Sequence, residues 1–294
     1  MSDKAHVHSS LRHLRGILAL LRPKQWIKNG FVLAPLIFSG EFTHGQAVGY
    51  AAMAMLLFCV ASSATYIVND LHDVETDRRH PIKSKGRPLA AGTVTTKSAY
   101  ATLIVLYAFL FVGSLAMLGV GAVILAYIVL NLLYTFALKH QPVIDIFTVA
   151  TGFVLRVYAG AIAISVPLSH WMFVTTLCLA LYLAAVKRRQ ELARNSSRSR
   201  RTLEHYSLSL LDRYAEMSAT GVLVFFSIFV ISQRPELVIT IPLVLFGLFR
   251  YWHVVEVLGS GESPTDTLLA DWQLLLTVVL WVAICAWAIF TNST

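Results

Sequence analysis

Long apolar segments, separated by shorter polar stretches, recur along the whole chain. Each holds about 20 mostly apolar residues, and most lack a polar face at helical period, which is typical of helices that span a membrane. The pattern predicts an all-α, polytopic membrane protein that forms one transmembrane domain over residues 1–294. The nine predicted spans cover residues 25–41, 47–68, 98–118, 120–138, 143–163, 168–186, 216–233, 236–257 and 271–291.

The composition agrees with this class. Of the 294 residues, 56% are hydrophobic and only 14% are charged, whereas a soluble protein carries roughly 25% charged residues. The three cysteines lie inside apolar segments, so they are interpreted as core residues and not as a disulfide framework or a metal site. The first residues lack a small-residue cleavage site, so no cleaved signal sequence is expected.

Basic residues gather on alternate connections between the spans. They crowd before span one and between spans two and three, four and five, and six and seven, while the opposite connections hold a single basic residue, Arg234. The positive-inside rule then places the N-terminus in the cytoplasm and, with nine spans, the C-terminus outside. The long connections, about 69–97 and 187–215, would form a polar cap on the cytoplasmic side. The net charge of +8 is assigned to these flanks, so no nucleic-acid partner is expected.

Acidic residues follow the second span at once, in the stretch NDLHDVETD. On a helix Asn69, Asp73 and Asp77 recur every fourth residue and share a face, with Asp70 beside them. Carboxylates at this spacing repel one another unless a cation lies between them. Oxygen ligands suit Mg²⁺, which commonly joins protein carboxylates to substrate phosphates. The four residues are therefore a predicted magnesium site for a phosphate-bearing ligand.

A basic stretch comes directly after these acidic residues. Its side chains would bind the remaining phosphate charge of such a ligand; they are Arg78, Lys83, Lys85 and Arg87. The alternative is a solvated, charged connection at the membrane face, with basic residues that serve topology alone.

Other charged residues lie at or inside the apolar segments. Lys187 and Glu191 are four residues apart at the end of span six; topology and the helix dipole account for the lysine but not for the glutamate. Asp145 and Arg156 lie within span five, where ionisable groups mark a site or an internal pair. They are about 16 Å apart along the helix, so Arg156 needs an anionic ligand or a carboxylate from another helix. Arg250 raises the same question near an acidic connection.

The N-terminal stretch RPKQWIKNG has Lys24 and Lys28 on either side of Trp26. Trp flanked by basic residues is typical of an anchor at the membrane interface. The same residues would also suit a binding site for a lipid phosphate at headgroup level.

The stretch NDLHDVETD resembles the first aspartate-rich motif, N-D-x-x-D-x-x-x-D, of the UbiA-type intramembrane prenyltransferase superfamily. The resemblance covers nearly the whole chain. LRPKQWIKN, VIDIFTVATGFVLRVYAGAIA, PLSHW and KRRQEL resemble the branch that transfers phosphoribose to polyprenyl phosphates. Lys187-x-x-x-Glu191 stands where the typical prenyltransferase carries a second D-x-x-x-D motif, which argues against a donor that needs a second magnesium pair.

The resemblance implies a UbiA-type helix bundle in a bacterial inner membrane, with its active site facing the cytoplasm. The implied reaction is the Mg²⁺-dependent transfer of 5-phosphoribose from phosphoribosyl diphosphate to a polyprenyl (decaprenyl-type) phosphate, with release of diphosphate. The implied catalytic residues are Asp73, Asp77, Lys187 and Glu191, and the implied metal ligands are Asn69, Asp70, Asp73 and Asp77. The implied substrate-binding residues are Lys24, Lys28, Arg78, Lys83, Lys85, Arg87, Asp145, Arg156 and Arg188.

Two other functions stay open at this point. One is a prenyltransferase that joins a prenyl diphosphate to an aromatic acceptor, which would keep the Asn69, Asp73 and Asp77 site. The other is a membrane transporter, which would place charges near the middle of the membrane. A homo-oligomer is left open as well.

Overall fold

The structure is a computed structural model that describes residues 14–79, 83–194, 201–257 and 263–293. In this part of the chain, eight segments are long and apolar enough to cross a membrane. They correspond to predicted spans two to nine. Their helices are α3 (Gly45–His72), α6 (Thr96–Ala116), α7 (Leu118–Phe136), α8 (Ile144–Ala163), α9 (His170–Arg194), α10 (Leu208–Gln233), η5 with α11 (Pro235–Thr240 and Ile241–Val257) and α13 (Trp272–Ser293).

The first predicted span, residues 25–41, has a different structure from the others. It consists of the 3₁₀ helix η1 (Pro23–Leu33) and the short helix α2 (Ala34–Ser39), which ends at Gly40 in the left-handed conformation with φ 87°. It is therefore not one continuous α-helix of spanning length, and nine spans are not confirmed. The first span and the orientation of the chain stay predictions.

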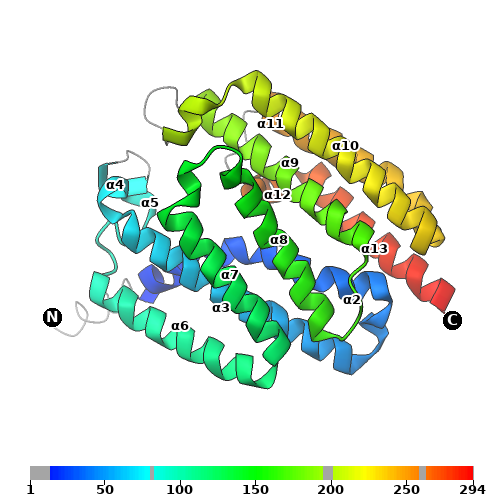
Figure 1. Cartoon of the computed structure of the whole chain (residues 1–294), viewed down its shortest axis with the longest axis horizontal. Coiled ribbons are helices and arrows are strands. Elements are labelled where there is room, and N and C mark those ends of the chain that lie inside the picture. The colour runs from blue at the N-terminus through cyan, green and yellow to red at the C-terminus, as the bar shows by residue number, and fades with distance from the viewer. Residues whose placement is uncertain (1–13, 80–82, 195–200, 258–262, 294) are drawn as a thin grey trace, which may run out of the picture.

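The connections expected as loops are partly helical. α3 extends to His72 and α9 to Arg194, so both long helices reach beyond their predicted spans. The remaining elements are short: η2 (Glu41–Thr43), α4 (Val74–Arg79), α5 (Lys83–Gly86), η3 (Leu138–His140), η4 (Arg201–His205) and α12 (Pro264–Ala270). In Figure 1, α4 and α5 lie at the left end of the bundle, and α13 ends at the opposite side.

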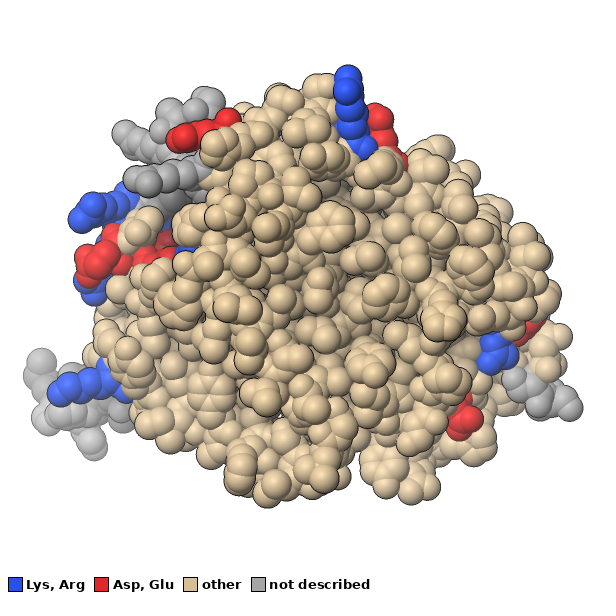
Figure 2. All heavy atoms as spheres, viewed as in Figure 1, with Lys and Arg blue, Asp and Glu red and all other residues tan. Residues whose placement is uncertain are grey.

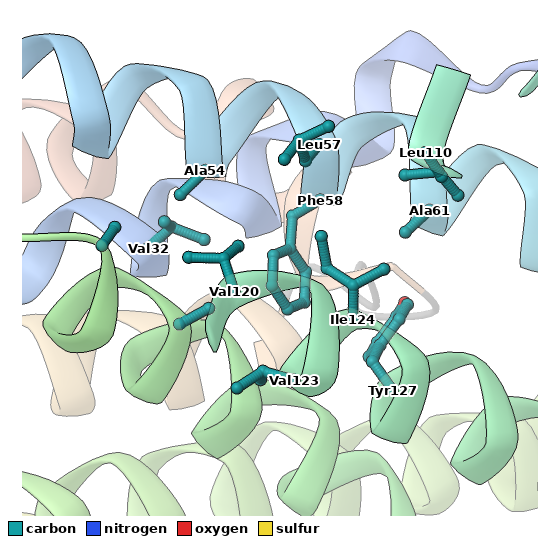
Figure 3. Close-up of a cluster of buried hydrophobic side chains, with 12 residues drawn as sticks. Val32, Ala54, Leu57, Phe58, Ala61, Leu110, Val120, Val123, Ile124 and Tyr127 are labelled. Carbon is teal, nitrogen blue, oxygen red and sulfur yellow. The ribbon is translucent and has the colours of Figure 1, made fainter. Parts of the chain in front are cut away.

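A cluster of apolar side chains joins α3 to α7 and η1. Figure 3 shows Phe58 of α3 pointing between Val120 and Ile124 of α7. The ring of Tyr127 lies 5.3 Å from that of Phe58, centroid to centroid. Small residues such as Ala54 and Ala61 lie on the same side of α3, which lets helices approach closely inside a membrane.

The helices differ greatly in how much of their surface other helices cover. In the most apolar 18-residue stretch of α8, 67% is buried inside the protein, whereas in that of α6 the share is 17%. The face in Figure 2 carries few charged side chains, and blue and red atoms gather at the edge where Figure 1 places α4 and α5. An apolar surface of this extent fits contact with lipid.

Candidate active site

The acidic cluster forms where α3 ends and α4 begins. Asp73 lies between the two helices, and its N–H donates to Asn69 O at 2.9 Å. The N–H of Asp77 donates in turn to Asp73 O at 2.8 Å, so the four-residue spacing continues across the break. The side-chain amide of Asn69 donates to Asp73 Oδ2 at 3.2 Å. The side chains of Asn69 and Asp73 are therefore in contact, and Asp77 follows one turn later.

Two arginines hold the buried carboxylates of this cluster. Arg22 Nη2 donates to both oxygens of Asp70, at 2.5 and 2.7 Å. Arg87 Nη1 donates to Asp70 Oδ1 at 2.8 Å and also to Asp77 Oδ2. Lys83 Nζ lies 3.7 Å from Asp77 Oδ1. Buried carboxylates need such partners, because burial without them carries a large desolvation cost.

Lys139 is a member of the cluster that sequence analysis missed. It lies on η3, is only 7% exposed, and places Nζ 2.9 Å from Asp73 Oδ1. Its carbonyl accepts a hydrogen bond from Thr202 Oγ1 of η4 at 2.8 Å. In the sequence it is one basic residue after an apolar span, which the positive-inside rule explains completely. No local pattern indicates that it folds back onto an aspartate 66 residues earlier.

The cluster suits a divalent cation in its donor chemistry but not in its present arrangement. Within the described residues, no group of three or more His, Cys, Asp or Glu side chains is placed to hold a metal ion. The carboxylates of Asp70 and Asp77 instead converge on one guanidinium group, and Asp73 faces an ammonium group. Positive charge thus already lies between the acidic oxygens, which are the ligands that Mg²⁺ prefers.

A second buried network centres on Arg188, which is 4% exposed. Its Nε donates to Asp145 Oδ2 at 2.7 Å, its Nη1 to Glu191 Oε2 at 2.6 Å and its Nη2 to the Tyr134 hydroxyl at 2.8 Å. Lys187 Nζ lies 3.8 Å from the other oxygen of Glu191. The network joins α7, α8 and α9, so these residues, predicted separately, form one internal ion-pair system.

Tyr206 completes the second network. Its hydroxyl donates to Asp145 Oδ1 at 2.8 Å and accepts from the Val143 N–H at 2.6 Å. Burial raises the pKa of Tyr206, so the hydroxyl stays protonated and remains a donor to the carboxylate. Sequence analysis missed this residue as well, because an isolated tyrosine outside the apolar spans carries no periodic signal.

Arg156 has partners of a kind that the sequence did not predict. An anionic ligand or a carboxylate was expected, but among the described residues its hydrogen bonds go to neutral acceptors. These are Asn29 Oδ1 at 2.8 Å, Gly152 O at 2.7 Å and the Tyr127 hydroxyl at 3.0 Å. The side chain is 5% exposed and lies over aromatic rings. Among the described residues it has no carboxylate partner, and a contact with an anionic substrate stays a prediction.

The remaining predicted residues lie outside these buried networks. Lys24 and Lys85 are exposed, and Lys28 is half-buried. Arg78 is exposed and forms a 2.7 Å ion pair with Glu75 on the same short helix. Arg250, whose role the sequence left undecided, pairs with Asp271 at 2.6 and 3.1 Å and so ties α11 to the start of α13.

The fold and the two networks together define a multi-pass helical membrane protein with charged groups buried near one end of its bundle. Residues 32–265 match the model of the UbiA prenyltransferase family. The chain belongs to this family, and it is therefore a membrane-embedded transferase.

Curated relatives match over almost their full length. The decaprenyl-phosphate phosphoribosyltransferase of Corynebacterium glutamicum is 36% identical, over 94% of this chain and 87% of the relative. The enzyme of the same name from Mycobacterium tuberculosis (strain H37Rv) is 33% identical, over 96% of this chain and 97% of the relative.

Solved structures share the fold at much lower sequence identity. A UbiA homolog from Archaeoglobus fulgidus bound to GPP and Mg²⁺ aligns with a TM-score of 0.74 at 18% identity, over 94% of this chain and 99% of that one. The same homolog bound to Cd²⁺ gives a TM-score of 0.71 at 17% identity, over 93% of this chain and 99% of that one. The likeness establishes the UbiA fold for this chain.

Proposed function

We propose that this protein transfers 5-phosphoribose from phosphoribosyl diphosphate to a polyprenyl phosphate and releases diphosphate. The observation that carries the proposal is the cluster in which Asp73 and Asp77 face the basic groups of Lys139 and Arg87. Such a site offers oxygen ligands for a metal and cations for phosphate oxygens at the same place. Two curated relatives that match almost the whole chain are named decaprenyl-phosphate phosphoribosyltransferase, which supports the same reaction.

The donor diphosphate would bind at the acidic cluster. Asn69, Asp73 and Asp77 would hold Mg²⁺, which when bound supplies positive charge to the leaving diphosphate. Asp70 differs from the other three because two arginines occupy its oxygens, so we assign it to holding Arg22 and Arg87.

The basic side chains of the cluster, which pair with carboxylates in this structure, would then bind the phosphate groups of the donor. Lys139, Lys83 and Arg87 each lie within ion-pair distance of Asp73 or Asp77. With those aspartates holding Mg²⁺, the three cations would be available to bind the donor phosphates. Arginine binds phosphate in a bidentate manner and lysine as a point charge. Arg78 and Lys85, which are exposed on α4 and α5, would contribute at the edge of the site.

Transfer at C1 of the ribose passes through an oxocarbenium-like state, as in other glycosyl transfers. The acceptor phosphate is an anion near pH 7, so the reaction needs no general base. Lys24 and Lys28 would hold this phosphate at headgroup level, with the isoprenoid chain in lipid. Glu191, which Arg188 and Lys187 orient, would accept from ribose hydroxyls. Catalysis then consists of positioning and electrostatic stabilisation.

A prenyltransferase that uses a prenyl diphosphate and an aromatic acceptor is the second candidate, since a solved relative of the same fold binds GPP. It would require a second acidic pair for metal at the end of α9. That place holds Lys187 and Glu191, and Glu191 accepts from Arg188.

The test is a transfer assay with the purified protein in detergent. Decaprenyl phosphate, Mg²⁺ and labelled phosphoribosyl diphosphate are supplied, and label is measured in the lipid phase. We expect lipid-bound label that is lost on chelation. Label-free lipid, together with activity from a prenyl diphosphate and an aromatic acid, would overturn the proposal in favour of the second candidate.

A further inference from the structure

The helix η1 is unusual because it is an eleven-residue 3₁₀ helix. Runs of more than three or four residues are uncommon in this form, since its hydrogen bonds have poorer geometry. Other contacts must therefore hold it. Two side chains of η1 bond to α3: Trp26 Nε1 donates to Ser63 Oγ at 3.0 Å, and Asn29 Nδ2 donates to Ser62 Oγ at 3.2 Å.

Arg156 supplies the matching link from η1 to α8. Its Nε donates to Asn29 Oδ1 at 2.8 Å, so the fully buried amide of Asn29 joins η1, α3 and α8 at one point. The guanidinium group is itself fixed by Gly152 O and the Tyr127 hydroxyl, and its centre lies 4.8 Å from the centroid of the Tyr127 ring. A charged donor makes a stronger hydrogen bond to an amide oxygen than a neutral one does.

Gly160 makes a second contact with η1 from the same face of α8. It follows Arg156 by four residues, which places both positions on one side of the helix. A Cβ atom at Gly160 would lie 1.9 Å from Val32 O and 3.3 Å from Pro35 Cδ. The end of η1 therefore lies directly against the backbone of α8, at a distance that only glycine allows.

The other end of η1 reaches the acidic cluster. Arg22, at its N-cap, has a left-handed backbone with φ 53° and ψ 56°, a conformation that non-glycine residues rarely adopt. Its guanidinium group binds Asp70 and lies 4.9 Å from the centroid of the Tyr66 ring. The position of η1 along α3 and α8 thus sets where Arg22 meets Asp70.

We propose that Arg156 is a positioning residue that anchors η1 through Asn29 and thereby places Arg22 against Asp70. This role is separate from the substrate contact expected from the sequence, which stays a prediction. The anchoring rests on the contacts described here alone, whereas its effect on donor binding rests on the proposed function. A buried cation with neutral partners is costly inside a membrane, and a fixed structural link accounts for its presence there.

Hydrogen–deuterium exchange of the detergent-solubilised protein tests the anchoring without any assay of activity. In Asn29→Leu and in Arg156→Met, backbone amides of residues 23–33 should exchange roughly tenfold to hundredfold faster, because each change removes a hydrogen bond to a charged group. Amides of α13 should keep their exchange rates in both variants. Unchanged exchange in residues 23–33 would overturn the proposal.

A pair of glycine variants repeats the test without touching Arg156 or Asn29. Gly160→Ala should push η1 away and speed exchange in residues 23–33. Gly49→Ala, at an exposed position of α3, is the matched control, because a Cβ there would have no neighbour within 4 Å. Equal exchange in the two alanine variants would count against a close contact between η1 and α8.

Kinetics then separate positioning from a general loss of structure. We expect Asn29→Leu to raise the KM for phosphoribosyl diphosphate about tenfold, with little change in kcat and in the KM for polyprenyl phosphate. Faster exchange with an unchanged donor KM, or a loss of kcat alone, would overturn the positioning role. A wild-type protein without transfer activity would refute the proposed function, and the exchange data would still decide the anchoring.

Discussion

Lys139 and Asp73 form an ion pair of 2.9 Å between side chains that are 66 residues apart in the sequence. The lysine comes from η3, after α7, and the aspartate from the end of α3. The contact therefore closes the acidic cluster from a second part of the bundle, and it brings a buried ammonium group to the centre of the proposed donor site.

Lys139→Met should weaken binding of the donor more than it slows turnover. We expect the KM for phosphoribosyl diphosphate to rise roughly 10- to 100-fold, because a hydrogen bond to a charged group is lost. Lys97→Met, at an exposed position at the start of α6, is the matched control and should keep the wild-type KM. Equal effects of the two substitutions would remove Lys139 from the donor site.

Asp73→Asn should reduce transfer by about a hundredfold or more, because it removes a charged ligand from the proposed magnesium site. The residual activity should need a higher Mg²⁺ concentration, which a titration of rate against Mg²⁺ measures. Glu75→Gln is the matched control, since Glu75 is exposed and pairs with Arg78 on its own short helix. If Asp73→Asn and Glu75→Gln respond to Mg²⁺ alike, Asp73 is not a ligand.

Arg188→Met should destabilise the protein by about 3–5 kcal/mol, because it leaves Asp145 buried without its charged partner. The double variant Arg188→Met/Asp145→Leu should recover part of that loss, since no unpaired charge remains. Chemical denaturation in detergent measures the free energy of unfolding of the single and the double variant. A double variant no more stable than the single one would show that the pair does not account for the loss.

Labelling of single cysteines from either side of the membrane tests the orientation of the chain. In a background without the native cysteines, Lys85→Cys on α5 should react with an impermeant maleimide from the cytoplasmic side alone. Gln46→Cys, at the start of α3, should react from the opposite side alone; both positions are exposed. The reverse pattern would overturn the predicted orientation.

The eight long apolar segments could be predicted from the sequence because apolar length alone determines them. The 3₁₀ form of η1 could not, since η1 packs against residues such as Arg156 and Gly160, more than a hundred residues later. The acidic face of Asn69, Asp73 and Asp77 followed from local spacing. Two of its basic partners did not, because Arg22 and Lys139 reach the cluster only through the packing of distant elements.

The unequal burial of α8 and α6 has a consequence for how the sequence can change over time. α8 places Asp145, Arg156 and Gly160 against specific neighbours, so most replacements along it remove a partner or cause a clash. α6 faces mostly outward, and most of its positions should tolerate any apolar residue. Among descendants of this protein, α6 should drift freely among apolar residues, while α8 keeps its side chains.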